Sequence, residues 1–169
     1  SIRQEAQSLI TQLHNAHKET HLLSGDRIES AQNTSEQLGI KHFLGNLKPE
    51  DKLESVNKLQ KRGAIDVMTD DGLNDAPVLV GANLSIAMRK GTQLAAAAAD
   101  MILISNNIEH IFHGYQIAIK TIRIIKQNLS WAVLYNVIAI PASASGYVEP
   151  CLAAIGRATC SPVVVLTAS

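Results

Sequence analysis

Residues 67–77 read Val67-Met68-Thr69-Asp70-Asp71-Gly72-Leu73-Asn74-Asp75-Ala76-Pro77. The apolar run that ends in Val67 and Met68 indicates a strand, and carboxylates and an amide follow it around a single glycine. Mg²⁺ prefers oxygen ligands and commonly takes only one or two carboxylates, with water and a substrate phosphate completing its shell. Asp71 and Asp75 are therefore the predicted magnesium ligands. The alternative is a solvated acidic turn between a strand and a helix.

The charges of the chain are unevenly distributed. The 169 residues carry 15 Lys and Arg and 15 Asp and Glu, which gives a formal net charge of zero. From Gln127 to Ser169, however, only Glu149 and Arg157 are charged. No nucleic-acid partner is expected, because phosphates call for a basic face. No cationic signal peptide opens the sequence, so the polar part is expected to be cytoplasmic.

Short apolar runs alternate with helical patterns over the first hundred residues. Strands are predicted at 20–23, 42–44, 64–68, 84–88 and 101–104, and helices at 1–18, 27–38, 49–62, 76–81 and 92–99. Gly39 is expected to end the second of these helices. Such alternation is typical of a parallel sheet covered by helices on both faces, with right-handed crossovers. Functional groups then belong at the carboxyl ends of the strands.

Two further segments carry groups suited to a phosphate. Ser24-Gly25-Asp26 follows a predicted strand, where a hydroxyl and adjacent backbone amides can hold a phosphoryl oxygen. The same tripeptide is also common at the start of a helix, with Asp26 as its cap. Lys52 follows Pro49 in a predicted helix, and its compact ammonium suits a phosphoryl group whose charge grows towards the transition state. The alternative for Lys52 is a solvent-facing side chain.

The apolar part of the chain predicts two membrane-spanning helices. Residues 129–148 carry no charge, and about 20 residues are enough to cross a hydrocarbon core of about 30 Å. Lys120, Arg123 and Lys126 precede this segment and favour the cytoplasmic side of a membrane. Residues 150–168 predict the returning span.

Three segments resemble the motifs of P-type ATPases, which are ion pumps whose phosphorylation domain has the haloacid dehalogenase fold. Residues 70–77 resemble Gly-Asp-Gly-x-Asn-Asp-Ala-Pro, except that Asp70 replaces the first glycine. Ser24-Gly25-Asp26 is similar to Thr-Gly-Asp, which implies a phosphate-holding loop. Residues 49–52 look like Pro-Glu-x-Lys. The resemblance implies a Rossmann-like α/β domain.

The resemblance also implies roles for individual side chains. Asp71 and Asp75 would bind Mg²⁺, and Asn74 would orient the nucleophilic site. Lys52 would neutralise an aspartyl-phosphate. The catalytic residues of the expected site are thus Ser24, Gly25, Asp26, Lys52 and Asn74.

The apolar part resembles the last two membrane helices of heavy-metal, copper-type pumps. Residues 124–141 are similar to the penultimate helix, and residues 153–156 to the start of the last one. In the copper branch, the residues that match Tyr135, Asn136 and Ser161 line the ion path. The resemblance implies the same role for these three side chains.

Together these resemblances imply the C-terminal part of a heavy-metal, copper-type P-type ATPase. A partial phosphorylation domain is expected at 1–107, a linking helix at 108–128, and membrane helices at 129–148 and 150–168. The expected fold is a haloacid dehalogenase-like α/β domain, a parallel sheet with helices on both faces, followed by two transmembrane helices. The complete pump would use ATP and Mg²⁺ to move Cu⁺ or a related heavy-metal ion across the cell membrane. Its partners would be the rest of the pump or a split partner.

One group that the family requires does not occur in this sequence. The family phosphorylates the aspartate of Asp-Lys-Thr-Gly-Thr, and no such string is present. The chain alone is therefore expected to form no phosphoenzyme. Two alternatives stay open: a regulatory or split-subunit membrane protein that docks on a complete pump, and a haloacid dehalogenase-type phosphatase. The phosphatase would need a nucleophilic aspartate on its first strand.

Overall fold

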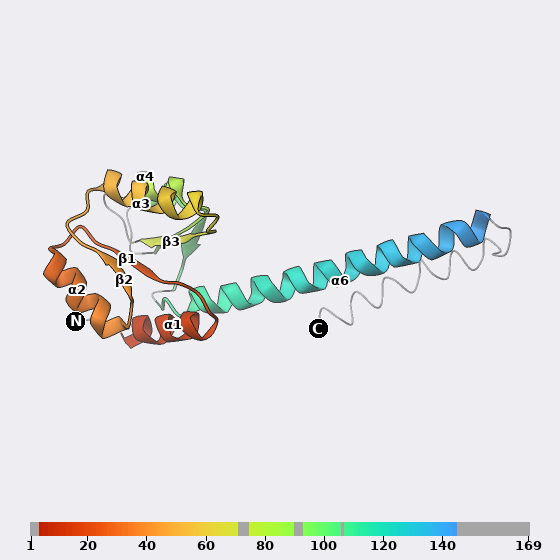
Figure 1. The fold of residues 1–169 in the computed structure, drawn as a ribbon, viewed down its shortest axis with the longest axis horizontal. Helices are drawn as coiled ribbons and strands as arrows, with labels where there is room; N and C mark the ends of the chain where they lie inside the picture. The colour runs from red at the N-terminus through yellow and green to blue at the C-terminus, as the bar shows by residue number, and fades with distance from the viewer. Residues whose placement is uncertain (1–3, 71–74, 90–92, 106, 145–169) are drawn as a thin grey trace. The chain divides into compact units, whose positions relative to one another are not determined.

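The computed structural model describes residues 4–70, 75–89, 93–105 and 107–144 (Figure 1). The chain divides into two compact units, Ser1–His113 and Gly114–Ser169. The elements in order are α1 (Gln4–Asn15), β1 (His21–Leu23), α2 (Ile28–Leu38), β2 (His42–Leu44), α3 (Pro49–Lys61), β3 (Val67–Asp70), α4 (Ala76–Gly81), β4 (Leu84–Met88), α5 (Gln93–Ala98), β5 (Met101–Leu103) and α6 (His110–Ala144).

These elements lie close to their predicted positions, with one clear shift. Gly39 ends α2 in the left-handed conformation, at φ 72°, as predicted. The strand predicted at 64–68 instead begins at Val67 and runs to Asp70, because it pairs with β4 over these four residues. Ile65 lies before this strand and is 88% exposed. Its apolar side chain suggested a strand, but the pairing with β4 sets the real start.

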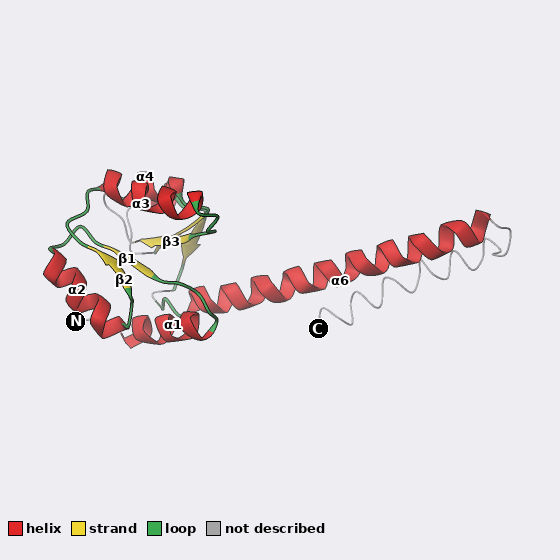
Figure 2. Cartoon of the chain, viewed as in Figure 1, coloured by secondary structure: helices red, strands yellow, loops and turns green. Residues whose placement is uncertain are grey.

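All strand pairs in the first unit are parallel, as the alternation of strands and helices predicted. β1 pairs with β2, and β4 lies between β3 and β5 (Figure 2). The described strands therefore form two sheets, whereas the sequence predicted one. The two sheets are separate because β1 and β3 do not pair with each other among the described residues.

Helices cover both sides of these strands. Figure 2 shows α3 and α4 on one side and α1 and α2 on the other. The core between β4, α4 and α5 is formed by Leu79, Ala87 and Ala95, each with no exposed surface. A Cβ atom on Gly81 would lie 2.3 Å from Leu53 Cδ1, so α3 and α4 approach closely there. This contact fixes the position of α3, which carries Lys52.

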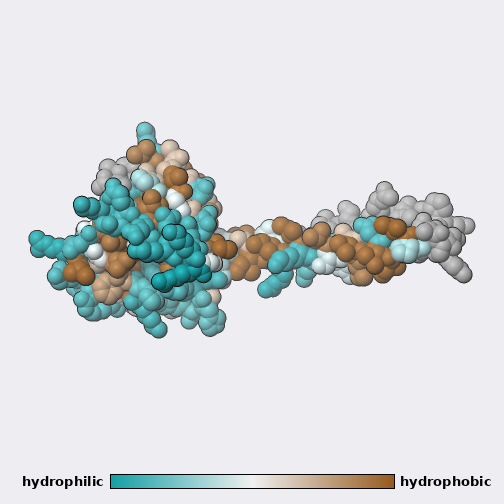
Figure 3. Space-filling model, turned by 45° about the horizontal axis from the view of Figure 1, so that its top comes forward, coloured by the Kyte–Doolittle hydropathy of each residue, from teal (hydrophilic) through white to brown (hydrophobic). Residues whose placement is uncertain are grey.

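α6 is a 35-residue helix that carries a long series of exposed apolar side chains (Figure 3). Among the described residues, no helix is both long and apolar enough to cross a membrane. The helix predicted to span at 129–148 is described only as far as Ala144.

The membrane-spanning helix at 129–148 stays a prediction, because the structure describes this segment only in part. The second predicted span, at 150–168, lies outside the described residues.

Candidate functional site

The central contact of the candidate site is an ion pair between Lys52 and Asp75. The Lys52 ammonium donates a hydrogen bond to Asp75 Oδ2, and the two residues are 23 positions apart in the chain. Their side chains are only 12% and 11% exposed. The alternative of a solvent-facing Lys52 is therefore wrong. Because each charge is largely removed from water, each depends strongly on the other.

Helix starts position both partners. Pro49 is the first residue of α3, and the Lys48 backbone N–H donates to Asp51 Oδ2 at 3.0 Å. A proline here suits the fixed φ of the first turn, and Asp51 satisfies an amide near the helix start. Asp75 caps α4, where its carbonyl oxygen accepts from the amides of Val78 and Leu79. Lys52 and Asp75 thus come from two adjacent helix N-termini.

Ser24, Gly25 and Asp26 form a tight loop directly after β1. The Asp26 backbone N–H donates to Ser24 Oγ at 3.1 Å. Arg27, not Asp26, occupies the cap position of α2, so the alternative of Asp26 as a helix cap is wrong. A Cβ atom on Gly25 would lie 3.3 Å from the carbonyl oxygen of Leu47. The loop therefore favours glycine where the two backbones approach.

Hydrogen bonds tie this loop to the segment that leads into α3. The Leu47 N–H donates to Ser24 O at 3.1 Å, and the Asn46 N–H donates to Asp26 O at 2.6 Å. Asn46 adopts a φ of 56°, a left-handed conformation that asparagine tolerates better than most residues. Ser24 follows β1, Asn46 follows β2, and Asp75 follows β3. Ser24 and Asp75, two of the predicted groups, thus each follow the carboxyl end of a strand.

Asp75 is the predicted magnesium ligand that lies among the described residues. The described residues contain no group of three or more His, Cys, Asp or Glu side chains that could hold a metal ion. Asp75 offers hard carboxylate oxygens and fits Mg²⁺, which takes one or two carboxylates and fills its shell with water and phosphate. A cation at Asp75 would share that carboxylate with Lys52. Asp71 and Asn74 lie outside the described residues.

The chain is similar to known proteins in both sequence and fold. The haloacid dehalogenase-like hydrolase family matches residues 1–83. The chain is 36% identical to the copper-transporting ATPase of Helicobacter pylori (strain ATCC 700392 / 26695) over 163 residues, which cover 93% of the chain and 22% of that protein. It is 37% identical to the copper-exporting P-type ATPase of Staphylococcus aureus (strain MRSA252) over 168 residues, which cover 99% of the chain and 21% of that protein.

A solved structure extends the likeness to nearly the whole chain. The crystal structure of a zinc-transporting PIB-type ATPase in the E2.Pi state superposes with a TM-score of 0.92 and 30% identity, and covers 99% of this chain and 28% of that one. The first unit has a haloacid dehalogenase-like α/β fold, and the chain is similar to part of the heavy-metal P-type ATPases. The chain spans about a fifth of the length of its curated relatives, 22% and 21% for the two named above.

Gln60 links three segments of the haloacid dehalogenase-like domain at the end of α3 opposite Lys52, and no sequence motif predicted this link. Its side-chain amide donates to Asp66 Oδ1 at 2.8 Å and to the Gly81 carbonyl oxygen at 2.9 Å. It therefore links the last turn of α3 to the start of β3 and the end of α4. A single glutamine in a polar helix resembles any solvated side chain, so only the folded structure reveals this link.

A second link in this domain involves Asp100, which precedes β5. The backbone N–H and the hydroxyl of Ser85 both donate to Asp100 Oδ2 at 2.9 Å. These two hydrogen bonds, the backbone one first, hold the pKa of Asp100 below its usual value. Ser85 is 1% exposed and lies in β4, so the carboxylate fixes β4 to the turn before β5.

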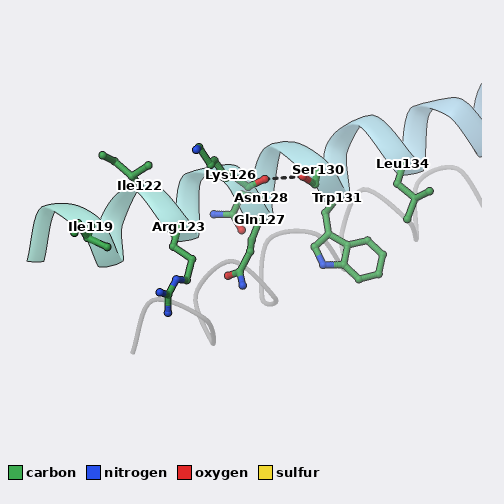
Figure 4. A pocket seen from close by; sticks show the side chains of 9 residues that line it. All are labelled: Ile119, Ile122, Arg123, Lys126, Gln127, Asn128, Ser130, Trp131 and Leu134. Carbon is green, nitrogen blue, oxygen red and sulfur yellow. Dashed lines mark hydrogen bonds between the residues drawn. The ribbon is translucent and has the colours of Figure 1, made fainter. Parts of the chain in front are cut away.

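Two of the three predicted ion-path residues belong to α6. Tyr135 and Asn136 are consecutive residues of this helix, with Tyr135 partly buried and Asn136 exposed. Ser161 lies outside the described residues. Just before Tyr135, nine side chains of α6 between Ile119 and Leu134 line an open hollow (Figure 4). Trp131 and Arg123 project towards the same side in this view.

Proposed function

We propose that the first unit supplies the magnesium-binding and phosphate-stabilising half of the phosphorylation site of an ATP-driven heavy-metal pump, with Cu⁺ as the cargo. The observation that carries this proposal is the largely buried ion pair between Lys52 and Asp75 beyond the carboxyl end of β3. In open α/β sheets, ligands bind outside the carboxyl ends of the strands. The names of the curated relatives support copper as the cargo, and the solved relative is described as zinc-transporting.

Lys52 acts in this proposal as a fixed positive charge. Its ammonium is already held by Asp75 and is largely removed from water, so binding a phosphoryl group requires little reorganisation. Electrostatic attraction is also stronger where water is excluded. Lys52 transfers no proton and offsets the charge that develops on the phosphoryl oxygens. Asp75 keeps the ammonium in place when no phosphate is bound.

Ser24 and Gly25 would hold a second side of the phosphoryl group. Ser24 Oγ accepts a hydrogen bond from the Asp26 N–H, which leaves the hydroxyl proton available to donate to a phosphoryl oxygen. The close approach of Gly25 to the Leu47 carbonyl leaves little room for a side chain there. The loop thus presents its hydroxyl and backbone to the ligand without crowding it.

Asp75 would bind Mg²⁺ together with Asp71, and Asn74 would orient the attacking group. When bound, Mg²⁺ neutralises phosphate charge and orients the transferring group. Asp70 is the last residue of β3 and directly precedes Asp71. The P-type ATPase motif has a glycine at this position. The additional carboxylate of Asp70 places a further negative charge at this end of the strand.

The attacking aspartate would come from the remainder of the pump. β1 and β3 each have an edge with no paired strand among the described residues. An edge strand presents unpaired backbone amides and carbonyls and is a template for a further strand. A strand that carries the phosphorylated aspartate would complete the site, and the chain alone would then be inactive.

The assignment of the other regions also belongs to this proposal. Residues 1–107 would form the partial phosphorylation domain, residues 108–128 the linking helix, and 129–148 and 150–168 the membrane helices. Tyr135, Asn136 and Ser161 would line the ion path, and the polar domain would face the cytoplasm. The alternative of a separate split partner gains no support from the comparisons.

The decisive experiment supplies the missing aspartate motif and nucleotide-binding domain by in-frame fusion before Ser1. With [γ-³²P]ATP and Mg²⁺, the fusion is expected to form an acid-stable phosphoenzyme, whereas the original chain forms none. Lys52→Ala and Asp75→Asn should each lower the labelling at least tenfold, because each removes one partner of the buried pair.

Lys58→Ala is the matched control. Lys58 lies on the same helix, is 64% exposed and pairs with Glu54 on the surface. Its substitution should leave the labelling unchanged. Labelling that survives Asp75→Asn, or that appears in the original chain, would contradict the proposal.

A further inference from the structure

Two histidines stack at the amino ends of β1 and β2. His21 and His42 are the first residues of their strands and are direct partners in the parallel register. Their ring centroids lie 4.8 Å apart, with 18° between the ring planes. The Nε2 atoms of both rings approach the same oxygen, Glu19 Oε1, at 2.8 Å for His21 and 3.4 Å for His42. One point in space is therefore within reach of both imidazoles.

This histidine pair is open to solvent and separate from the candidate phosphorylation site. The side chains of His21, His42 and Glu19 are 27%, 55% and 63% exposed. The pair lies at the amino ends of the strands, whereas Ser24 follows the carboxyl end of β1. At about 3.3 Å per residue, the three residues of β1 separate the two places by about 10 Å.

We propose that His21 and His42 form a binding site for a divalent first-row transition metal ion such as Zn²⁺ or Cu²⁺. Imidazole nitrogen suits these ions, which it binds at about 2.0–2.1 Å in the case of zinc. The strand register already places the two rings together, so small side-chain rotations bring both nitrogens to one ion. Water completes the coordination shell.

Glu19 supplies a negative charge beside this ion. In the metal-free protein, Glu19 Oε1 lies near the Nε2 atoms of both rings. A cation bound to these two nitrogens would place its positive charge beside the same carboxylate. The described residues contain no cluster of three or more candidate ligands, so the protein contributes two nitrogens and not a closed cage. Such an open, two-ligand site is expected to exchange its metal readily.

Zinc binding to the full chain tests this inference by isothermal titration calorimetry. The two cysteines, Cys151 and Cys160, are replaced by serine in every sample so that thiolates do not compete for the ion. One Zn²⁺ is expected to bind per chain. His42→Gln should weaken this binding at least tenfold, because it converts a chelate into a single ligand, and Glu19→Gln should weaken it severalfold.

A pair of histidines in α6 provides the matched control. His110 and His113 are three positions apart at the start of α6, and replacing both with glutamine removes the same number of imidazoles. This variant should keep the wild-type affinity. Equal zinc affinity in His42→Gln and wild type, or loss of binding in the His110→Gln/His113→Gln variant, would overturn the inference.

A thermal melt separates loss of the site from loss of the fold. Without metal, His42→Gln should melt as the parent does, because His42 is half-exposed. With Zn²⁺, the melting temperature of the parent should rise and that of His42→Gln should not, since a ligand stabilises only the state that binds it. An equal rise in both proteins would also overturn the inference.

Discussion

The first and last turns of α3 each carry a lysine in an ion pair, and the two pairs differ sharply in burial. Lys52 pairs with Asp75 from another helix, and the two side chains are 12% and 11% exposed. Lys58 pairs with Glu54 one turn away, and these side chains are 64% and 66% exposed. Ion pairs in water contribute little to stability, whereas a buried charge without its partner is costly. The value of a lysine on this helix therefore depends on its surroundings and not on its residue type.

Breaking the buried pair should have the largest effect. Lys52→Ala leaves the Asp75 carboxylate uncompensated, and removing one partner of a buried pair costs about 3–5 kcal/mol of unfolding free energy. Urea unfolding followed by circular dichroism measures this loss. The double variant Lys52→Met/Asp75→Leu should recover most of it, because no charge remains unpaired. A double variant as unstable as Lys52→Ala would show that the charges are not the cause.

Crowding the contact beside that pair should have the next largest effect. Gly81→Ala places a Cβ atom 2.3 Å from Leu53 Cδ1, on the residue next to Lys52. Leu53 Cδ1 is the end of a flexible side chain that can rotate away, so the expected cost is at the lower end of the about 1–3 kcal/mol typical of overpacking. The same unfolding measurement tests this, and Leu53→Ala in the Gly81→Ala background should relieve the clash. An unchanged stability in Gly81→Ala would mean that α3 moves away freely.

Asp100 provides an intermediate case, an exposed carboxylate held by the buried Ser85. Its pKa is lowered in the folded protein by the Ser85 hydrogen bonds, so the unfolded state binds the proton more tightly. The stabilisation is therefore present above about pH 4, the ordinary value for aspartate, and is lost as the pH falls through the lower folded pKa. Stability measured against pH should fall less steeply below pH 4 in Asp100→Asn than in wild type. Parallel curves would contradict this.

Removing the exposed pair should have the smallest effect. Lys58→Ala is expected to change the unfolding free energy by less than about 0.5 kcal/mol, as is usual for an exposed pair one helical turn apart. The small difference should also shrink in high salt, which screens surface charges. A loss comparable to that of Lys52→Ala would remove the distinction between the two turns of α3.

Local sequence signals located most elements of the first unit. Pro49 predicted the start of α3 and Gly39 the end of α2, because each residue favours one backbone conformation. The start of β3 was placed too early, since Ile65 is apolar but lies before the paired residues. The strand begins where β4 offers hydrogen bonds, which is information that the apolar run does not contain.

The motifs predicted the residues of the candidate site, but they did not predict its central contact. The sequence assigned Lys52 to a phosphate and Asp75 to a metal, and the structure brings these two side chains into contact with each other. Gln60 gave no signal at all. Contacts across 23 residues depend on how α3 and α4 pack, so spacing in the sequence does not reveal them.

By itself, the sequence determined the order of strands and helices, their parallel character and the family motifs, because backbone preferences and apolar spacing act over a few residues. Only the tertiary structure decided which charges are buried together and which histidines face each other across β1 and β2. Burial and register are properties of packed surfaces. They arise when distant segments exclude water from one another, and no single segment carries that information.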